Sequence, residues 1–454
     1  MYNETECPIT LGMQTKVPIS GGVFKTLFKQ LLSAALIKHL LAAHAAKLRR
    51  RPPTVTAFEL ILGLVFHVIA GSGTLAQHVK KVTSKTITDG ALSQRRAEIP
   101  MAVFDGLMAA ALRPKANAQE HPQAFYQGLR LCGVDGSRFS VANTLQVKAG
   151  MNKAASRRKK AAFAKIGVAV MVELGLHNPI GAIIGHQEES EMKLAMPLLG
   201  CLPAESLLLG DRYYGVPKVL IDLVAQYPQG RREFLVRVRS NIKARVLESY
   251  ADGSALVEIR SKKRTLLVRE ITGRVRRGKN QWSTVRLWTS LLDWKKHPAS
   301  QLLALYAQRW EEESFYRELK VDMRSASLVK SQTPLTAAQE IAALILAYSI
   351  LVDERVKAAQ VGQVGVLRIS FLKTLEALRG LWSFLEIAID LLTPETVRLL
   401  VRRTLRQIAE MAIPKRRQRS CPRALRQPVS SWPRLLENSY QTGAPEYEIS
   451  RILS

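Results

Sequence analysis

The sequence predicts an α/β fold in which helical regions precede and follow a central sheet. Two observations favour this class. Residues 126–240 alternate short apolar runs, typical of buried strands, with stretches of helical periodicity. Residues 22–98, and the chain after Lys320, are instead dominated by helical patterns. We therefore expect a helical domain over residues 1–120, a sheet-containing domain over 121–325 and a helical C-terminal region over 326–454.

The first helices are marked by periodicity and by residues that begin or break them. Residues 22–48 are rich in Leu and Ala and predict one helix, which a basic stretch from Lys47 to Pro53 ends. A second helix should run from Thr56 to the Gly71-Ser-Gly73 break. We expect the region to continue with two short helices over residues 74–82 and 88–98.

These two short helices resemble a helix-turn-helix. Thr88 is placed to N-cap the second one, which would present Ser93, Gln94, Arg95 and Arg96. A helix of this kind can enter a major groove. A plain packing domain with a solvated basic face fits the same pattern equally well. The residues alone leave the two interpretations level.

Two aspartates follow short apolar runs of the predicted sheet. Asp135 ends the run that begins at Leu129, and Asp211 ends the run that begins at Ser206. Functional groups of open α/β sheets gather at the carboxyl ends of strands. If the two strands are parallel neighbours, both carboxylates emerge at one edge. A single aspartate after a strand is more often a turn residue, but the pair precedes a helix that carries a third carboxylate.

The elements around the second aspartate continue the alternation. A hairpin is predicted over residues 166–173 and 179–185, followed by a helix near 188–196. A helix over 216–227 and a strand over 234–238 should come after Asp211. The loop 153–160 carries five positive charges and is available for phosphate contacts, although it could merely aid solubility.

Residues 240–285 predict an inserted β-region dense in Arg and Lys. Strands are expected over 255–259 and 266–271, with a basic turn over 276–280. Trp282 follows this turn, and an aromatic ring beside cations can stack on an unpaired base. A core position is the alternative for Trp282. Trp288, on an apolar strand, is predicted to belong to the core.

The stretch from Pro298 to Met323 predicts one uninterrupted helix. At about 100° per residue, Tyr306, Arg309, Glu313 and Lys320 fall within a stripe roughly 60° wide. A carboxylate flanked by two cations and a phenol suits a site that holds a divalent metal and grips a phosphate backbone. A surface helix with an Arg309–Glu313 ion pair is the alternative. Phosphodiester chemistry on nucleic acid is the favoured interpretation.

The chemistry of such a site follows from its carboxylates. Asp135, Asp211 and Glu313, brought together, would repel one another and raise each other's pKa unless a cation is present. Oxygen ligands favour Mg²⁺ or Mn²⁺, and two ions can serve the attacking and leaving oxygens of a displacement. Arg309 and Lys320 would hold backbone phosphates, and Tyr306 would donate a hydrogen bond to one.

Composition favours a polyanionic partner. There are 67 Lys and Arg against 37 Asp and Glu, a net charge of +30, and DNA or RNA is the expected partner. No window of 18 uncharged apolar residues is found, and residues 57–70 are too short to span a bilayer. The first ten residues lack signal-peptide character. Four cysteines without metal-ligand spacing fit reduced thiols. We expect a cytoplasmic location and no membrane contact.

The C-terminal region is predicted to be helical, with a basic tail. Helices are expected over 337–358, 367–391 and 394–411, followed by a proline-rich tail over 414–433. These helices could form a dimer interface, and the tail could bind DNA. Ordinary packing and a disordered end explain the same residues.

The predicted helix from Pro298 to Met323, called the motif helix below, carries a family resemblance. Tyr, two residues, Arg, three residues, Glu, six residues, Lys is the YREK signature of one branch of bacterial insertion-sequence transposases of the DDE type. Asp135-Gly-Ser looks like the first aspartate motif of that family, and Gly-Asp211-Arg-Tyr-Tyr214-Gly looks like the second. The resemblance implies catalytic, metal-binding roles for Asp135, Asp211 and Glu313. It also implies a ribonuclease-H-like core with a β insertion and an N-terminal DNA-binding region.

The resemblance implies an activity as well. Such enzymes cut double-stranded DNA at transposon ends and join the 3′ hydroxyl ends to target DNA, here by a cut-and-paste route through a hairpin intermediate. A homodimer in a paired-end complex, in the nucleoid of a bacterial cytoplasm, is the expected setting. A structure-selective metal-dependent nuclease is one alternative. A catalytically silent, transposase-derived DNA-binding regulator is another, although the intact set of three carboxylates argues against it.

Overall fold

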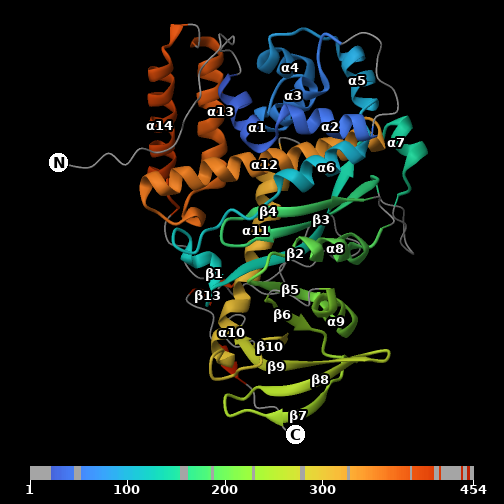
Figure 1. Ribbon diagram of the computed structural model, residues 1–454, viewed down its shortest axis with the longest axis vertical. Coiled ribbons are helices and arrows are strands. Elements are labelled where there is room, and N and C mark those ends of the chain that lie inside the picture. The colour runs from blue at the N-terminus through green and yellow to red at the C-terminus, as the bar shows by residue number, and fades with distance from the viewer. Residues whose placement is uncertain are drawn as a thin grey trace, which may run out of the picture.

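The computed structural model describes most of the chain between residues 22 and 413. The described ranges are 22–44, 53–153, 162–185, 189–226, 231–276, 282–324, 328–388 and 391–413, with the short strands 419–420, 441–442 and 447–449. A large mixed sheet forms the centre of the molecule, and the helices of the N-terminal and C-terminal regions lie together at one end of it (Figure 1).

The sheet has the ribonuclease-H-like order. Strands β4 (Asn178–Ile184), β3 (Lys165–Glu173) and β2 (Leu129–Val141) are antiparallel neighbours. Strands β5 (Ser206–Gly215) and β6 (Arg232–Val238) then follow, parallel to β2. The expected α/β class is therefore confirmed. The predicted neighbouring, parallel arrangement of the two aspartate strands is present.

The inserted strands extend this same sheet. Strand β10 (Trp282–Thr289) pairs with β6, and β9 (Arg264–Arg276), β8 (Ala255–Ser261) and β7 (Arg245–Ser249) follow outward. The continuous backbone pairing makes the insertion an edgewise extension of the catalytic sheet. Of the turn predicted over 276–280, residue 276 ends β9 and residues 277–280 lie outside the described residues.

Two faces of the sheet are covered by different helices. Helices α8 (Glu191–Leu198) and α9 (Pro217–Gln226) pack on one face in a cluster that includes the buried Trp288. Helix α10 (Ala299–Leu305) packs on the other face. The indole Nε1 of Trp288 donates to the Glu270 carboxylate at 2.7 Å, which satisfies its polar atom inside the core. The core prediction for Trp288 is confirmed.

The N-terminal helices share a core with the C-terminal ones. Helix α12 (Pro334–Gly362) runs along the helical end beside α3 (Ala57–Ala70) and α6 (Met101–Ala111). The other helices of this end are α1 (Gly22–Leu31), α2 (Ala34–His44), α4 (Leu75–Thr83), α5 (Asp89–Ala97), α13 (Phe371–Ala388) and α14 (Pro394–Glu410); α7 (Leu145–Gly150) lies nearby. The proposed division at residues 120 and 325 stays a prediction.

Two predicted helices are wrong in their continuity. The helix expected over 22–48 is broken after Leu31, because the Ser33 hydroxyl accepts the amide hydrogen of Leu36 and begins α2. The expected continuous α-helix from 298 to 323 is also broken. It consists of α10, the 3-10 segment η3 (Tyr306–Arg309), α11 (Trp310–Arg317) and the π-helical segment η4 (Glu318–Asp322).

Apolar helix α12 is the longest in the described part of the chain. By length and composition it could cross a membrane, as could α3 and α4 if taken as one bent pair. Of its most apolar window, however, 83% is buried inside the molecule. From the sequence alone, residues 57–70 are the nearest candidate, and they are too short to span a bilayer. Burial of this extent is the environment of a core helix.

Candidate active site

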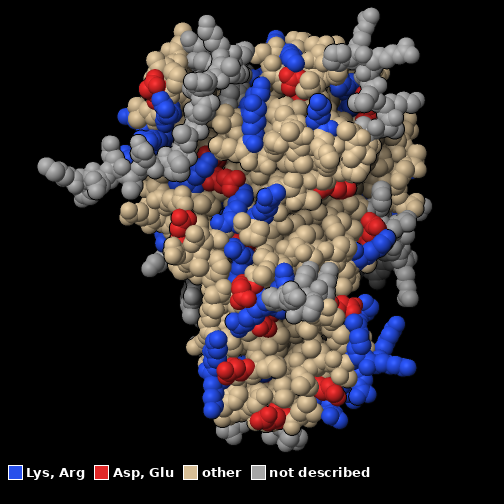
Figure 2. Space-filling view, viewed as in Figure 1, with Lys and Arg blue, Asp and Glu red and all other residues tan. Residues whose placement is uncertain are grey.

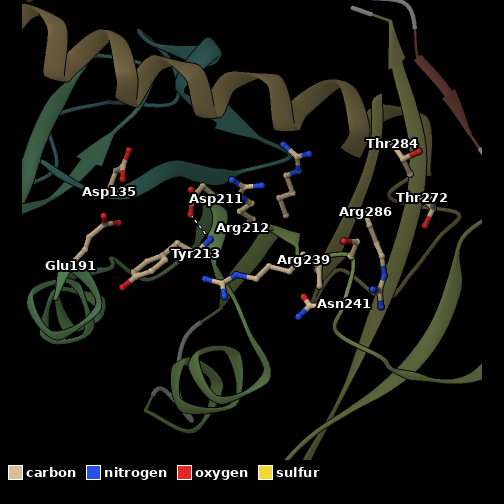
Figure 3. Close-up of a pocket in the computed structure, with 13 residues that line it drawn as sticks. Asp135, Glu191, Asp211, Arg212, Tyr213, Arg239, Asn241, Thr272, Thr284 and Arg286 are labelled. Carbon is tan, nitrogen blue, oxygen red and sulfur yellow. Dashed lines mark hydrogen bonds between the residues drawn. The ribbon is translucent and has the colours of Figure 1, made fainter. Parts of the chain in front are cut away.

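The two aspartates meet at one cleft. Asp135 lies on β2 and Asp211 on the neighbouring parallel strand β5, and both line a cleft of about 770 Å³ (Figure 3). The Asp135 Oδ1 accepts the amide hydrogen of Gly136 at 2.8 Å. The Asp211 Oδ1 accepts that of Tyr213 at 2.6 Å. The predicted strand-end position is wrong, because both strands continue beyond their aspartate. The parallel pairing of β2 with β5 stops two residues earlier, at Gly133 and Leu209, so both carboxylates follow its carboxyl end.

A third cleft carboxylate was not predicted. Glu191 begins α8 after the N-cap Ser190 and faces the cleft beside Asp135. Its Oε1 accepts the hydroxyl hydrogen of Tyr214 at 2.9 Å. The sequence shows only an acidic first-turn residue, which is common in helices. Packing of α8 against β2 and β3 brings it to the site.

The opposite end of the cleft is basic. Figure 3 shows Arg212, Arg239 and Arg286 on the side away from Asp135 and Glu191. Arg286 donates to the Glu270 carboxylate at 2.7 Å, which fixes it on β10. The other lining residues at this end are Arg237, Val238, Ser240, Asn241, Thr272 and Thr284. The cleft thus joins a carboxylate end to an arginine-rich end that the inserted strands help to build.

The carboxylate end is electrostatically strained without a cation. Burial, together with the charges of Glu191 and Asp211, raises the pKa of Asp135 to about 7, against the lowering effect of the Gly136 amide and Arg309. A carboxyl group with this pKa binds a proton or a cation at neutral pH. The donors are all oxygens, the set preferred by Mg²⁺ and Mn²⁺.

The motif helix crosses the two aspartate strands. The Tyr306 hydroxyl donates to the Gly210 carbonyl at 3.2 Å, next to Asp211, and burial raises the pKa of Tyr306 to about 12. Lys320 donates to Ser137 Oγ and to the Arg138 carbonyl, both at 3.0 Å, just beyond Asp135. In this structure, therefore, the phenol and the ammonium group bond to the strands that carry the aspartates.

Arg309 and Glu313 form an ion pair on this helix. The guanidinium donates to the Glu313 Oε1 at 2.8 Å. Arg309 is nearly buried, and its charge also acts on Asp135 and Asp211. Glu313 is not among the residues that line the cleft, and 35% of its side chain is exposed. Its neighbour Glu312 is 1% exposed and lies against Gly133 of β2.

The carboxylates do not form a closed metal cage as they stand. Among the described residues, no group of three His, Cys, Asp or Glu side chains is close enough to hold an ion. One carboxylate oxygen, Glu312 Oε1, is buried without a hydrogen-bond partner. An orphaned acidic oxygen and the raised pKa of Asp135 both fit a site that a cation would neutralise.

A buried clamp holds the far end of the motif helix. His177, in the β3–β4 turn, contacts the Glu311 and Glu318 carboxylates at 2.9 Å each. Glu318 also accepts the Tyr348 hydroxyl hydrogen at 2.6 Å and pairs with Arg355, both on α12. The clamp thus ties the motif helix to the sheet and to α12. Local sequence patterns do not predict this clamp, because its members lie far apart in the chain.

The remaining predicted DNA contacts have different surroundings. Trp282 is 41% exposed, with the Arg274 guanidinium 5.6 Å from its ring centroid, so it does not lie in the core. Arg96 of α5 donates to the Thr336 carbonyl at 2.7 Å, and Arg95 pairs with Glu98. Ser93 and Gln94 are exposed. The loop 154–160 and most of the basic tail lie outside the described residues.

The sheet carries aspartates on neighbouring parallel strands, and a helix with consecutive glutamates crosses beside them. Residues 127–350 match the family model described as "Transposase DDE domain". Over these residues the chain is similar to the DDE transposases of bacterial insertion sequences.

Individual relatives agree with this family. The chain is 26% identical over 252 residues to the transposase InsG for insertion sequence element IS4 of Escherichia coli (strain K12). That match covers 54% of this chain and 56% of the relative, so the chain spans about half of the relative's length. It is 23% identical over 232 residues to InsZ of the same organism, covering 49% and 74%.

A solved structure is also similar. It is the piggyBac transposase synaptic complex with hairpin DNA, at a TM-score of 0.42 and 13% identity, covering 86% of this chain and 85% of that one. Divalent-metal dependence is a general property of the DDE family. The YREK spacing remains a resemblance.

Proposed function

We propose that this chain cuts DNA at the ends of an insertion sequence and joins the freed 3′ hydroxyl ends to target DNA. The observation that supports this most is the cleft, where Asp135 and Asp211 on parallel neighbours face an arginine-rich wall. The glutamate helix crosses beside it. Carboxylates that could hold a cation and arginines that could hold a phosphate backbone then lie within one cavity.

The proposed site uses Asp135, Asp211 and Glu313 as ligands of two Mg²⁺ or Mn²⁺ ions. When bound, the ions would supply an activated oxygen nucleophile and stabilise the leaving oxygen. Arg309 now pairs with Glu313, and it would turn to a phosphate when that carboxylate is engaged elsewhere. Arginine suits this exchange because its planar fork fits carboxylate and phosphate alike.

The protein groups around the cleft would hold the substrate. Arg212 and Arg239 are exposed side chains of its lining and would contact backbone phosphates. Tyr316 donates to the Asp135 carbonyl at 2.7 Å, which fixes β2 under the reacting bond. Exposed Trp282 would stack on an unpaired base. A hairpin at the element end, a homodimer pairing two ends and a nucleoid location in the cytoplasm complete the proposal.

The test is an assay of purified protein with labelled element-end DNA, a plasmid target and Mg²⁺. Wild type should nick the end and join it to the plasmid. Asp135→Asn, Asp211→Asn and Glu313→Gln should each reduce cleavage by at least about 10³-fold, while binding of end DNA persists. Exposed Glu410→Gln on α14 is the matched control. A variant with near-normal cleavage would remove that residue from the metal site.

The joining step separates the alternatives. Cleavage without joining would support a structure-selective nuclease. Tight end binding by the wild type with neither reaction would support a silent DNA-binding regulator. The intermediate is checked in the same assay, because a hairpin end migrates as a covalently closed product on a denaturing gel.

A further inference from the structure

The motif helix changes its winding twice around the glutamates. Residues 306–309 form the 3-10 segment η3, and residues 318–322 form the π-helical segment η4. In η4 the Met323 amide donates to the Glu318 carbonyl at 3.0 Å, five residues back. A 3-10 turn has 3.0 residues rather than 3.6, so η3 rotates the chain that follows by roughly 60–80° beyond α-helical winding. The wider π segment reverses this excess.

The excess rotation changes which glutamate faces the sheet. In a continuous α-helix, Glu313 would lie about 20° from the buried Leu302. With η3 in place, Glu312 points in the same direction as Leu302. Glu313 is rotated away from that direction by most of one residue's rotation, which is about 100° in an α-helix. The exposures agree, since Leu302 is 0% and Glu312 1% exposed, whereas the Glu313 side chain is 35% exposed. Lys320 lies within the π segment, returns to the sheet and bonds to β2.

A place for the Glu312 carboxylate is built into β2. Gly133 lies two residues before Asp135, on the same face of the strand. A Cβ atom at Gly133 would lie 2.3 Å from the Glu312 Oε2, so any side chain there would exclude the carboxylate. The glycine therefore opens the space that this glutamate fills.

One oxygen of the carboxylate in this space lacks a hydrogen-bond partner. Glu312 Oε1 is buried with no hydrogen-bond partner. The charges of Asp135, Asp211 and Glu191 act on it, and so does the opposite charge of Arg309. A position needed only for packing would be better filled by an apolar side chain, because a buried polar group without a partner is costly.

We propose that Glu312 supplies a further carboxylate to the cation site of Asp135 and Asp211, beside the motif glutamate Glu313. The proposal rests on the proposed function, because it assumes a cation at that site. It places two consecutive glutamates of one helix turn at the metal. The oxygen ligands are those of Mg²⁺ or Mn²⁺.

The experiment measures Mn²⁺ binding to the full chain by calorimetry, without DNA or catalysis. Glu312→Gln should weaken Mn²⁺ binding by at least about 10-fold, comparable with Asp135→Asn, and Glu410→Gln should not change it. Thermal melts in EDTA verify folding of each variant. If Glu312→Gln does not fold, Glu312→Leu, which suits the apolar burial of the site, replaces it.

One outcome would contradict the role of Glu312, and another would contradict the proposed function. In the first outcome, a folded Glu312 variant binds Mn²⁺ within twofold of wild type, whereas Asp135→Asn loses binding. Glu312 would then be a core residue only, and the proposed function would be intact. Unchanged Mn²⁺ binding in Asp135→Asn and Asp211→Asn as well, with no cleavage by wild type, would instead refute the proposed function.

Discussion

At the scale of single residues, His177 shows how a buried charge network positions this site. It adopts a left-handed backbone conformation with φ of 56° in the β3–β4 turn, which His tolerates better than most residues. Burial acts to lower the pKa of His177, but Glu318 and Glu311 outweigh it and raise that pKa. Burial likewise acts to raise the pKa of Glu318, but His177 and Arg355 lower it to about 2.

These shifts predict a pH window for stability. The contribution of Glu318 is present above its usual pKa of 4.5 and is lost as pH falls toward 2. The contribution of His177 is complete below its usual pKa of 6.5 and is lost as pH rises through its raised value. His177→Gln should therefore cost most near pH 4.5–6.5, by about 3–5 kcal/mol, in urea unfolding. A cost independent of pH from 5 to 9 would show that the imidazole acts while uncharged.

At the scale of elements, helix α5 is joined to helix α12 by polar contacts. The Arg96 guanidinium donates to Ser331 Oγ and the Thr336 carbonyl. In return, the Gln339 amide donates to the Arg96 and Ile99 carbonyls at 2.9 and 2.7 Å. The Arg96 side chain, predicted to contact DNA, is thus also a structural link. Exposed Ser93 and Gln94 are better placed to reach a groove.

Mutations can separate the structural role of α5 from its predicted role in DNA binding. Arg96→Ala should lower the free energy of unfolding by about 1.5–3 kcal/mol, the value of a hydrogen bond to a charged group. Gln94→Ala should leave unfolding unchanged and weaken binding of end DNA if α5 is the recognition helix. Urea titration and fluorescence anisotropy measure the two effects. Full stability of Arg96→Ala would mean that the contacts to α12 are dispensable.

At the scale of the whole molecule, charge is distributed in patches over the surface. Figure 2 shows Lys and Arg on both sides of the lower part of the molecule, most densely at the right, with acidic residues scattered among them. Because β10 pairs with β6, the inserted β-region also supplies Thr284 and Arg286 to the cleft. One sheet therefore carries both the carboxylates and the basic wall across which a DNA backbone would run.

This distribution of charge predicts how DNA binding in the cleft depends on salt concentration. Arg212→Ala and Arg239→Ala should each reduce the slope of log binding constant against log salt by about 0.9 for duplex DNA. Arg402→Ala, an exposed arginine of α14, serves as the control with an unchanged slope. Binding of end DNA is measured by anisotropy over a range of salt concentrations. Equal slopes in all three variants would place the DNA outside the cleft.

The sequence by itself located most of the elements and the positions of the two aspartates. Apolar runs located β2 and β5, and their shared direction put Asp135 and Asp211 at one edge. The N-cap of α5 was also predicted, because Thr88 accepts the Ala91 amide hydrogen. Such features depend on neighbours within a few residues, whose spacing the sequence states directly.

Only the tertiary structure decided the winding of the motif helix and the partners around it. Lys320 is held by a residue 183 positions away, and His177 reaches a glutamate 141 positions away. Such contacts shift a helix by a fraction of a turn, which is enough to bury Glu312 and turn Glu313 toward Arg309. Local periodicity assumes ideal α-helical winding, so it cannot anticipate a rotation that packing against β2, the β3–β4 turn and α12 imposes.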